Sequence, residues 1–266
     1  MTTETTGSGD ITRSLELLWG TGERPSRGPK PGLTLDRIVA TAVEVADAEG
    51  LGAVSMRRLS TELGTGTMSL YRYVPGKAEL LDLMLDRVSD PGPCDAPGPE
   101  VYIDWRDSVW AIARGFRDLY RAHPWLLKVN QVRTVLGPSA LQSLEAALTG
   151  LREIALSDAE KISVLISVQS FVTGIVRMES EAAEATEATG QSHEEFWEEQ
   201  EPFLDRAMRS GRYPTVAKLD PNAFGDEIDH FDFGLRRLIS GIEVLIRERG
   251  AVPPAPGKDG CRGPAS

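Results

Sequence analysis

Helical periodicity constrains this chain more than any other feature of its sequence. Apolar residues recur three and four positions apart almost everywhere outside three Pro/Gly-rich stretches, which are residues 20–32, 90–99 and 251–266. No stretch of useful length alternates between apolar and polar residues as a half-buried strand does. The pattern therefore predicts an all-α fold, and the stretch at 90–99 is a natural boundary between two helical domains.

We expect four regions along the chain. They are a disordered tail and basic arm at 1–32, a helix-turn-helix DNA-binding domain at 33–88, a larger helical ligand-binding and dimerisation domain at 100–250, and a disordered tail at 251–266. The start, MTTETTGSGD, lacks the basic residues and apolar core of a signal peptide. No run of 18 apolar residues indicates a membrane span. We therefore expect a cytoplasmic protein without membrane association, in which Cys94 and Cys261 are free thiols.

Charge is unevenly distributed along the chain. The net charge is −11, yet residues 24–87 hold nine Lys and Arg against eight Asp and Glu, which leaves this segment at +1. Three of these nine cations, Arg24, Arg27 and Lys30, belong to the basic arm. An acidic protein of this kind does not coat nucleic acid nonspecifically, but a small local surface can still contact phosphates. The arm could lie along DNA or enter a minor groove, or serve as a plain linker.

The segment LSTELGTGTMSLYRYVPGK, residues 59–77, predicts two short helices joined by a tight glycine turn. Thr34 is the expected N-cap of a helix that Gly50 ends, and Ser55 is the expected N-cap of the next. Gly64 breaks that second helix, and a third should run from about Thr67 until Pro75 and Gly76 end it. This order of elements is the helix-turn-helix arrangement.

The third helix has two distinct faces. Leu70 and Val74 are four residues apart and should pack inward, whereas Thr67, Met68, Tyr71 and Arg72 should face outward together. These outward groups can contact base edges or phosphates in a major groove. Lys77 begins the following helix, whose N-terminus also attracts phosphate. The same spacing fits a solvated helix end whose aromatic side chains pack into a neighbouring core.

The stretch MRRLSTELGTGTMSLYRYVPGKAELLDLMLD, residues 56–86, resembles the DNA-binding domain of the TetR family of transcriptional regulators. The match runs from about Thr34 to Asp86. One departure is Thr65–Gly66 in the turn, where the family more usually has a valine and a polar residue. The resemblance implies that operator DNA is contacted at Arg57, Thr67, Met68, Ser69, Tyr71, Arg72, Tyr73 and Lys77.

Three C-terminal stretches resemble the ligand-binding domain of tetracycline-repressor-like members of that family, namely Trp105–Leu126, Ser210–Pro214 and Phe231–Ile246. Apolar walls with a few polar groups are typical of a ligand pocket. Phe116 and Asn130 match pocket-lining positions in the subfamily. The full set of candidates is Trp105, Ile112, Phe116, Asn130, Gln131, Gln169, Thr173 and Arg177. Ordinary core packing with a few satisfied polar groups explains each of these residues equally well.

Two helices, near 158–180 and 226–248, carry broad apolar stripes. Two such helices from each of two chains can form a four-helix interface, although each stripe alone also fits an intrachain core. The subfamily resemblance favours the homodimer. A dimer would place two recognition helices about one DNA turn apart.

Signatures of catalysis are missing from the sequence. The three histidines and two cysteines are not at metal-ligand spacing, and there is no phosphate loop or nucleophile elbow. His193, among several glutamates, fits a solvated acidic face better than a metal cluster. We therefore expect no enzyme and no cofactor. The main hypothesis is a repressor released from double-stranded operator DNA by a small-molecule inducer, and the signal should pass through the helix that begins at Lys77. The alternatives are an activator of the same fold and a small-molecule-binding protein without DNA function.

Overall fold

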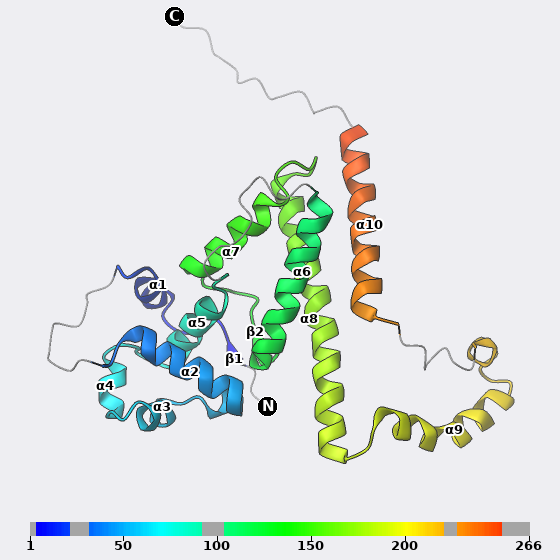
Figure 1. The fold of residues 1–266 in the computed structure, drawn as a ribbon, viewed down its shortest axis with the longest axis horizontal. Helices are drawn as coiled ribbons and strands as arrows, with labels where there is room; N and C mark the ends of the chain where they lie inside the picture. The colour runs from blue at the N-terminus through cyan, green and yellow to red at the C-terminus, as the bar shows by residue number, and fades with distance from the viewer. Residues whose placement is uncertain (1–3, 22–31, 92–103, 221–227, 252–266) are drawn as a thin grey trace, which may run out of the picture.

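The computed structural model describes residues 4–21, 32–91, 104–220 and 228–251. Among these residues the fold is almost entirely helical, as the periodicity predicts (Figure 1). The N-terminal part contains α1 (Ile11–Trp19), α2 (Leu35–Glu49), η1 (Leu51–Ala53), α3 (Met56–Glu62), α4 (Thr67–Tyr71) and α5 (Lys77–Val88). The C-terminal part contains α6 (Trp105–Ala122), η2 (Pro124–Lys128), α7 (Pro138–Thr149), α8 (Asp158–Thr189), α9 (His193–Arg209), η3 (Val216–Lys218) and α10 (His230–Ala251). Arg24, Arg27, Lys30, Cys94 and Cys261 lie outside the described residues.

The predicted helix ends in the N-terminal domain are confirmed. Thr34 Oγ1 accepts a hydrogen bond from Arg37 N, and Ser55 Oγ accepts one from Arg58 N, so each side chain caps an otherwise unpaired amide. Gly64 has a φ of +61°, a left-handed conformation that side chains disfavour, and it ends α3. The recognition helix α4 is shorter than predicted. It ends at Tyr71, and the chain then makes a turn in which Tyr73 N and Val74 N both donate to Leu70 O.

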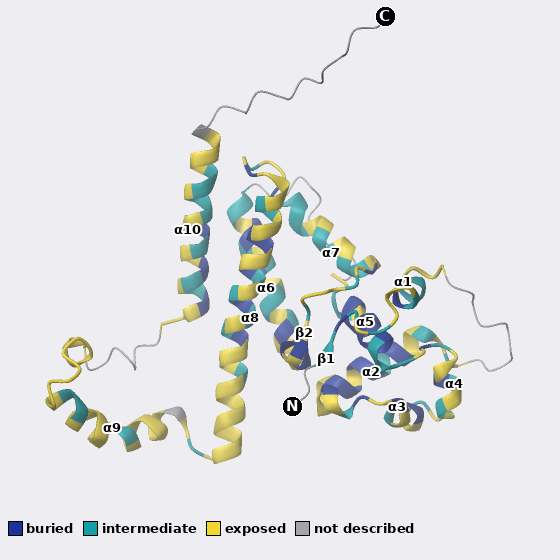
Figure 2. Ribbon diagram, turned by 180° about the vertical axis from the view of Figure 1, so that it is seen from behind, coloured by how far each residue is buried: buried dark blue, intermediate teal, exposed yellow. Residues whose placement is uncertain are grey.

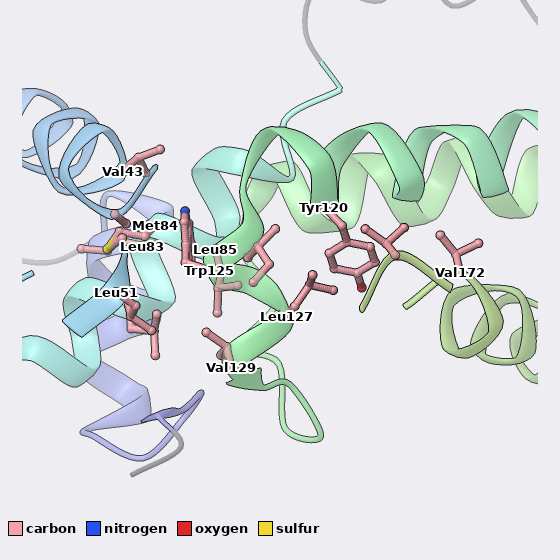
Figure 3. Close-up of a cluster of buried hydrophobic side chains, with 14 of the residues drawn as sticks. Val43, Leu51, Leu83, Met84, Leu85, Tyr120, Trp125, Leu127, Val129 and Val172 are labelled. Atoms are coloured by element: carbon pink, nitrogen blue, oxygen red, sulfur yellow. The ribbon is translucent and has the colours of Figure 1, made fainter. Parts of the chain in front are cut away.

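One buried apolar cluster connects the two parts of the chain. Trp125 of η2 lies among Leu83, Met84 and Leu85 of α5, and Leu127 follows it toward the C-terminal helices (Figure 3). In the C-terminal part, α8 packs on α6, α10 packs on both, and α7 packs on α5. The DNA-binding domain is therefore seated directly on the second domain through η2, α5 and α7.

The N-terminal segment differs from the disordered tail that its composition predicts. A two-residue strand, β1 (Glu4–Thr5), pairs in parallel with β2 (Val129–Asn130), and α1 packs against α5. The partners of these elements are far away in sequence. Local periodicity therefore gave no signal for the strand pair, and a helix of nine residues gains its stability mainly from tertiary packing.

The helix predicted near 158–180 extends beyond its expected end, and the one predicted near 226–248 is α10, which runs from His230 to Ala251. α8 continues to Thr189, and α9 projects from the body of the molecule with most of its surface exposed (Figure 2). By length and composition alone, α8 would be apolar enough to cross a membrane. Its buried residues Val164, Val168, Val172 and Val176 face the intrachain core, and a single helix of this kind is weak evidence for a membrane span.

Candidate nucleic-acid interface and ligand site

The recognition helix α4 separates its side chains as predicted. Leu70 and Val74 are fully buried, whereas Met68 is 77% exposed and Tyr71 is 45% exposed. Arg72, directly after α4, is also exposed. This division leaves a thioether and a phenol exposed on the helix that the motif would insert into a DNA groove, while two aliphatic side chains anchor it to the domain.

Two of the predicted DNA contacts also have structural roles. Thr67 Oγ1 donates to Ser60 Oγ at 3.3 Å and thereby ties the start of α4 to α3. Tyr73 is partly buried, and its hydroxyl donates to Leu33 O at 3.1 Å, which connects the end of the motif to the start of α2. Both hydroxyls are therefore bonded within the domain, and Ser69 is likewise only half-exposed.

The positive charges around α4 differ in their availability. Arg57 of α3 is exposed. Its neighbour Arg58 bridges Glu49 at 2.7 Å and Glu62 at 2.6 Å, and the hydrogen bond that it donates to Glu49 raises the pKa of the guanidinium above its ordinary value. Lys77 is at the first position of α5, but its Nζ is 3.0 Å from Glu4 Oε1. A phosphate at Lys77 would therefore compete with a carboxylate from the N-terminal segment.

The candidate ligand residues Asn130 and Gln131 lie on and beside β2. Asn130 is exposed, and its Oδ1 accepts a hydrogen bond from Val132 N. The amide of Gln131 donates to Leu126 O at 3.3 Å. Both side chains are thus bonded to nearby backbone, and they shape the loop that follows η2.

Four other candidates lie on α6 and α8, and two of them, Phe116 and Gln169, both contact Tyr120. Phe116 stacks on Tyr120 with the ring centroids 6.3 Å apart, and Gln169 Nε2 donates to the Tyr120 hydroxyl at 3.2 Å. Thr173 Oγ1 donates to Gln169 O, and Arg177 donates to Leu127 O at 3.0 Å. The sequence reasoning missed Tyr120, although it follows Phe116 by four residues and therefore shares its helix face.

Trp105 and Ile112 precede Phe116 on the same helix, and Ile112 is only one turn away from it. Both are partly buried against the core. Trp105 is at the first turn of α6, where the guanidinium of Arg106 lies 4.7 Å from its ring centroid. Eleven residues of α-helix separate Trp105 from Phe116, or about 16 Å. Trp105 therefore does not share a compact site with Phe116.

A separate cleft of about 420 Å³ opens between α6, α8 and the start of α10. Its lining consists of Arg117, Arg121, Ile175, Met178, Glu179, Ile228, Asp229, His230 and Phe231, and it includes none of the eight predicted ligand residues. Arg121 bridges Glu179 at 2.8 Å. The guanidinium of Arg117 lies 4.1 Å from the centroid of the Phe231 ring, while its Nε is buried without a hydrogen-bond partner. The only sequence signal for this cleft is the spacing of four residues between Arg117 and Arg121.

A helix-turn-helix domain with an exposed recognition helix, seated on a larger helical domain, defines a two-domain DNA-binding regulator. Comparison with family models agrees with that class. Residues 38–84 match the bacterial regulatory proteins of the tetR family, and residues 98–246 match the tetracyclin repressor-like C-terminal domain. The chain belongs to the TetR family, as residues 56–86 indicate.

Relatives similar to the whole chain are transcriptional regulators. The HTH-type transcriptional repressor DrrR1 of Streptomyces coeruleorubidus is 55% identical over 93% of this chain and 91% of its own length. An HTH-type transcriptional regulator of Saccharopolyspora erythraea is 33% identical over 85% and 90%. These proteins are not of an enzyme class. The fold resembles that of apo ActR from Streptomyces coelicolor, at 29% identity and a TM-score of 0.58 over 83% of this chain and 99% of that one.

ActR has also been solved with two small molecules. Its complex with actinorhodin is 30% identical to this chain with a TM-score of 0.56, over 82% of this chain and 99% of ActR. Its complex with (S)-DNPA has a TM-score of 0.57 at 29% identity, over 81% of this chain and all of ActR. These complexes are those of ActR. For this chain, the family match and the repressor relatives define a DNA-binding transcriptional regulator.

Proposed function

We propose that this repressor binds a palindromic operator as a homodimer in the cytoplasm and is released when a small molecule enters its C-terminal domain. The observation that carries the proposal is the division of α4, in which exposed Met68 and Tyr71 stand beside fully buried Leu70. Exposing a large apolar side chain and an aromatic one on a short helix is costly in water. A DNA groove that covers them accounts for the arrangement.

The proposed operator contacts are of two kinds, contacts to base edges and contacts to phosphates. Met68, the most exposed residue of α4, is placed for base edges, with Ser69 and Thr67 beside it. We assign the phosphate contacts to Tyr71, Arg57, Arg72 and Lys77. Tyr73 then serves mainly to hold the motif in shape, because its hydroxyl is bonded to Leu33 O.

The exposed faces of two long helices support the homodimer. Ile162 and Ile166 of α8 are exposed, although Val164, Leu165 and Val168 around them are buried within the chain. Phe233 and Val244 of α10 are exposed in the same way. The stripes are therefore divided between an intrachain core and an outer face. A second copy that covers the outer faces of α8 and α10 completes a four-helix interface.

The inducer that we propose is a largely apolar small molecule bound near Phe116, where α6 meets α8. The structures of ActR in complex with (S)-DNPA and with actinorhodin support a small-molecule ligand for this fold. Such a ligand acts only through its different affinities for the DNA-competent and DNA-incompetent states. A coupling of about 1–3 kcal/mol lowers operator affinity about 5- to 150-fold.

The test begins with a random pool of double-stranded DNA. Repeated selection with the purified protein should enrich one palindromic site, and Tyr71→Ala should weaken binding to that duplex without lowering the melting temperature. A thermal-shift screen of apolar compounds, with actinorhodin included, then supplies ligands for displacement assays. If no duplex is enriched, the chain does not read DNA. If a compound binds tightly and leaves operator affinity unchanged, the induction mechanism is wrong.

A further inference from the structure

We infer that the N-terminal segment Glu4–Trp19 is a strap that fixes the angle between the two domains and so controls operator binding. The inference deepens the proposed function and rests on it for the DNA part alone. In Figure 1 the segment runs past α5, with β1 beside β2 and α1 against α5. We call residues 4–19 the strap below.

The two ends of the strap are bonded to the C-terminal domain. Thr6 N donates to Asn130 O at 3.1 Å, and Thr6 Oγ1 donates to Arg133 O at 2.7 Å. At the other end, Trp19 Nε1 donates to Leu136 O at 3.3 Å. Thr6 is almost completely buried, so the hydrogen bonds at the first end are shielded from water.

The middle of the strap is bonded to α5 of the DNA-binding domain. Asp82 is buried, and its two carboxylate oxygens accept hydrogen bonds from Gly7 N at 2.9 Å and Ser14 Oγ at 2.8 Å. Glu79 is also buried and accepts one from Asp10 N at 2.8 Å. A buried carboxylate without such partners is strongly unfavourable, so α5 depends on the strap for two of its three buried acidic residues, while the third, Asp86, accepts hydrogen bonds from the start of α7.

Glycine at position 9 fits this close packing. A Cβ at Gly9 would lie 2.3 Å from Glu79 Oε1 and 2.9 Å from Ala78 Cβ, which is closer than atoms can approach. The backbone of the strap therefore lies directly against α5, with no room for a side chain between them. A flexible tail resting on the surface does not need such a contact.

The strap thereby links residues 129–136, which include the candidate ligand residues Asn130 and Gln131, to the connecting helix α5. A displacement of that loop pulls on Thr6, and the strap transmits the pull to Asp82. This path through the strap acts in addition to the direct path from the C-terminal domain through α5. It predicts that releasing the strap from the C-terminal domain loosens the angle between the domains even though α1 stays on α5.

The variant for the test is Thr6→Val with Trp19→Ala. It removes side-chain bonds to the C-terminal domain and leaves every bond to α5 in place. The matched control is Arg13→Ala, which removes an ion pair with Glu16 that lies wholly within α1. Thr6→Val alone is the milder second variant, and circular dichroism confirms that each protein is folded.

The first measurement is the distribution of distances between the domains. Nitroxide labels go on exposed Ala48 of α2 and exposed Glu145 of α7, each replaced by Cys, in a background with Cys94 and Cys261 replaced by Ser. Diluting labelled chains with unlabelled ones leaves only the distance within one chain. We expect the double variant to broaden the distribution and the control to match the parent protein. A distribution that stays unchanged in both strap variants overturns the inference.

The second measurement is operator affinity, with the duplex selected from the random pool. We expect the double variant to bind at least about 5-fold more weakly, at the lower end of common couplings between sites, and the control to bind like the parent. A broadened distribution with unchanged affinity overturns the regulatory role. If the parent protein binds no duplex, the proposed function fails, and the distance measurement still decides whether the strap exists.

Discussion

Trp125 Nε1 donates a hydrogen bond to Asp47 Oδ1 at 2.8 Å and so joins η2 of the C-terminal domain to the last turns of α2. The same oxygen lies 2.8 Å from Nδ1 of His123. Trp125 is only 2% exposed, which means that its indole N–H has little access to water. The Asp47 carboxylate of the DNA-binding domain thus contacts two ring nitrogens of the C-terminal domain, those of Trp125 and His123.

Removing that carboxylate should destabilise the protein. Asp47→Ala leaves the buried indole N–H of Trp125 unpaired, which should lower the free energy of unfolding by about 1–3 kcal/mol. Glu44→Ala, at an exposed position on the same helix, is the control and should change it by less than about 0.5 kcal/mol. Urea unfolding measures both variants, and equal stabilities would show that the bond is unimportant.

Adjacent residues of α4 should separate folding from DNA binding. Leu70→Ala removes a fully buried side chain and should cost about 2–5 kcal/mol of stability. Met68→Ala should leave the melting temperature nearly unchanged, because this side chain is 77% exposed, and it should alter the preference among operator variants if the side chain contacts base edges as we propose. Melting curves and gel-shift titrations on a small operator panel test the pair. Loss of stability in Met68→Ala would identify it as a packing residue.

Neutralising Glu4 should strengthen operator binding. Glu4→Gln frees the ammonium of Lys77 from its ion pair, and an exposed pair of this kind contributes only about 0–1 kcal/mol to stability. We expect operator affinity to rise about 2- to 5-fold, because the phosphate no longer competes with a carboxylate. Lys77→Ala should instead reduce the slope of log affinity against log salt by about 1. Operator affinity measured at several salt concentrations tests both variants, and weaker binding by Glu4→Gln would contradict the prediction.

A charge on the outer face of α8 should split the dimer. Ile166 is 57% exposed within one chain, so Ile166→Glu should leave the fold of the chain intact and bury an unpaired carboxylate only at the proposed interface. Leu141→Glu, also at an exposed apolar position but on α7, is the control. Sedimentation should give about twice 29.0 kDa for the parent and control, and about 29.0 kDa for Ile166→Glu. A parent that sediments as a monomer would refute the dimer.

Acid should weaken the contact between the start of α8 and the end of α10. Hydrogen bonds from the backbone and hydroxyl of Ser157, and then from Arg249, lower the pKa of Glu160 from 4.5 to about 2. A depressed pKa in the folded state adds stability above the unfolded value, and that stability is lost as pH falls from about 4.5 toward 2. Glu160→Gln should therefore lower the free energy of unfolding at neutral pH. The free energy of unfolding of this variant should then fall less than that of the parent between about pH 4.5 and pH 2. Thermal melts between pH 7 and pH 2.5 measure this, and parallel curves for the two proteins would contradict it.

Sequence alone determined the helix-turn-helix motif, because its signals are local. The caps Thr34 and Ser55 and the turn glycine Gly64 act on backbone groups within a few residues, and the spacing of Leu70 and Val74 fixes which face of α4 is buried. The resemblance to the TetR family rests on the same stretch. The placement of eight individual DNA-contacting residues is still a prediction.

Tertiary structure decided what depends on partners distant in the chain. Glu4–Thr5 becomes a strand only because Val129–Asn130 lies beside it, and Tyr73 becomes partly buried because Leu33 offers a carbonyl to its hydroxyl. The cleft beside Arg117 likewise exists only where three helices meet. Periodicity describes which face of a helix is apolar, but it carries no information about which distant segment covers that face. Contacts of that kind are set by the packing of the whole chain.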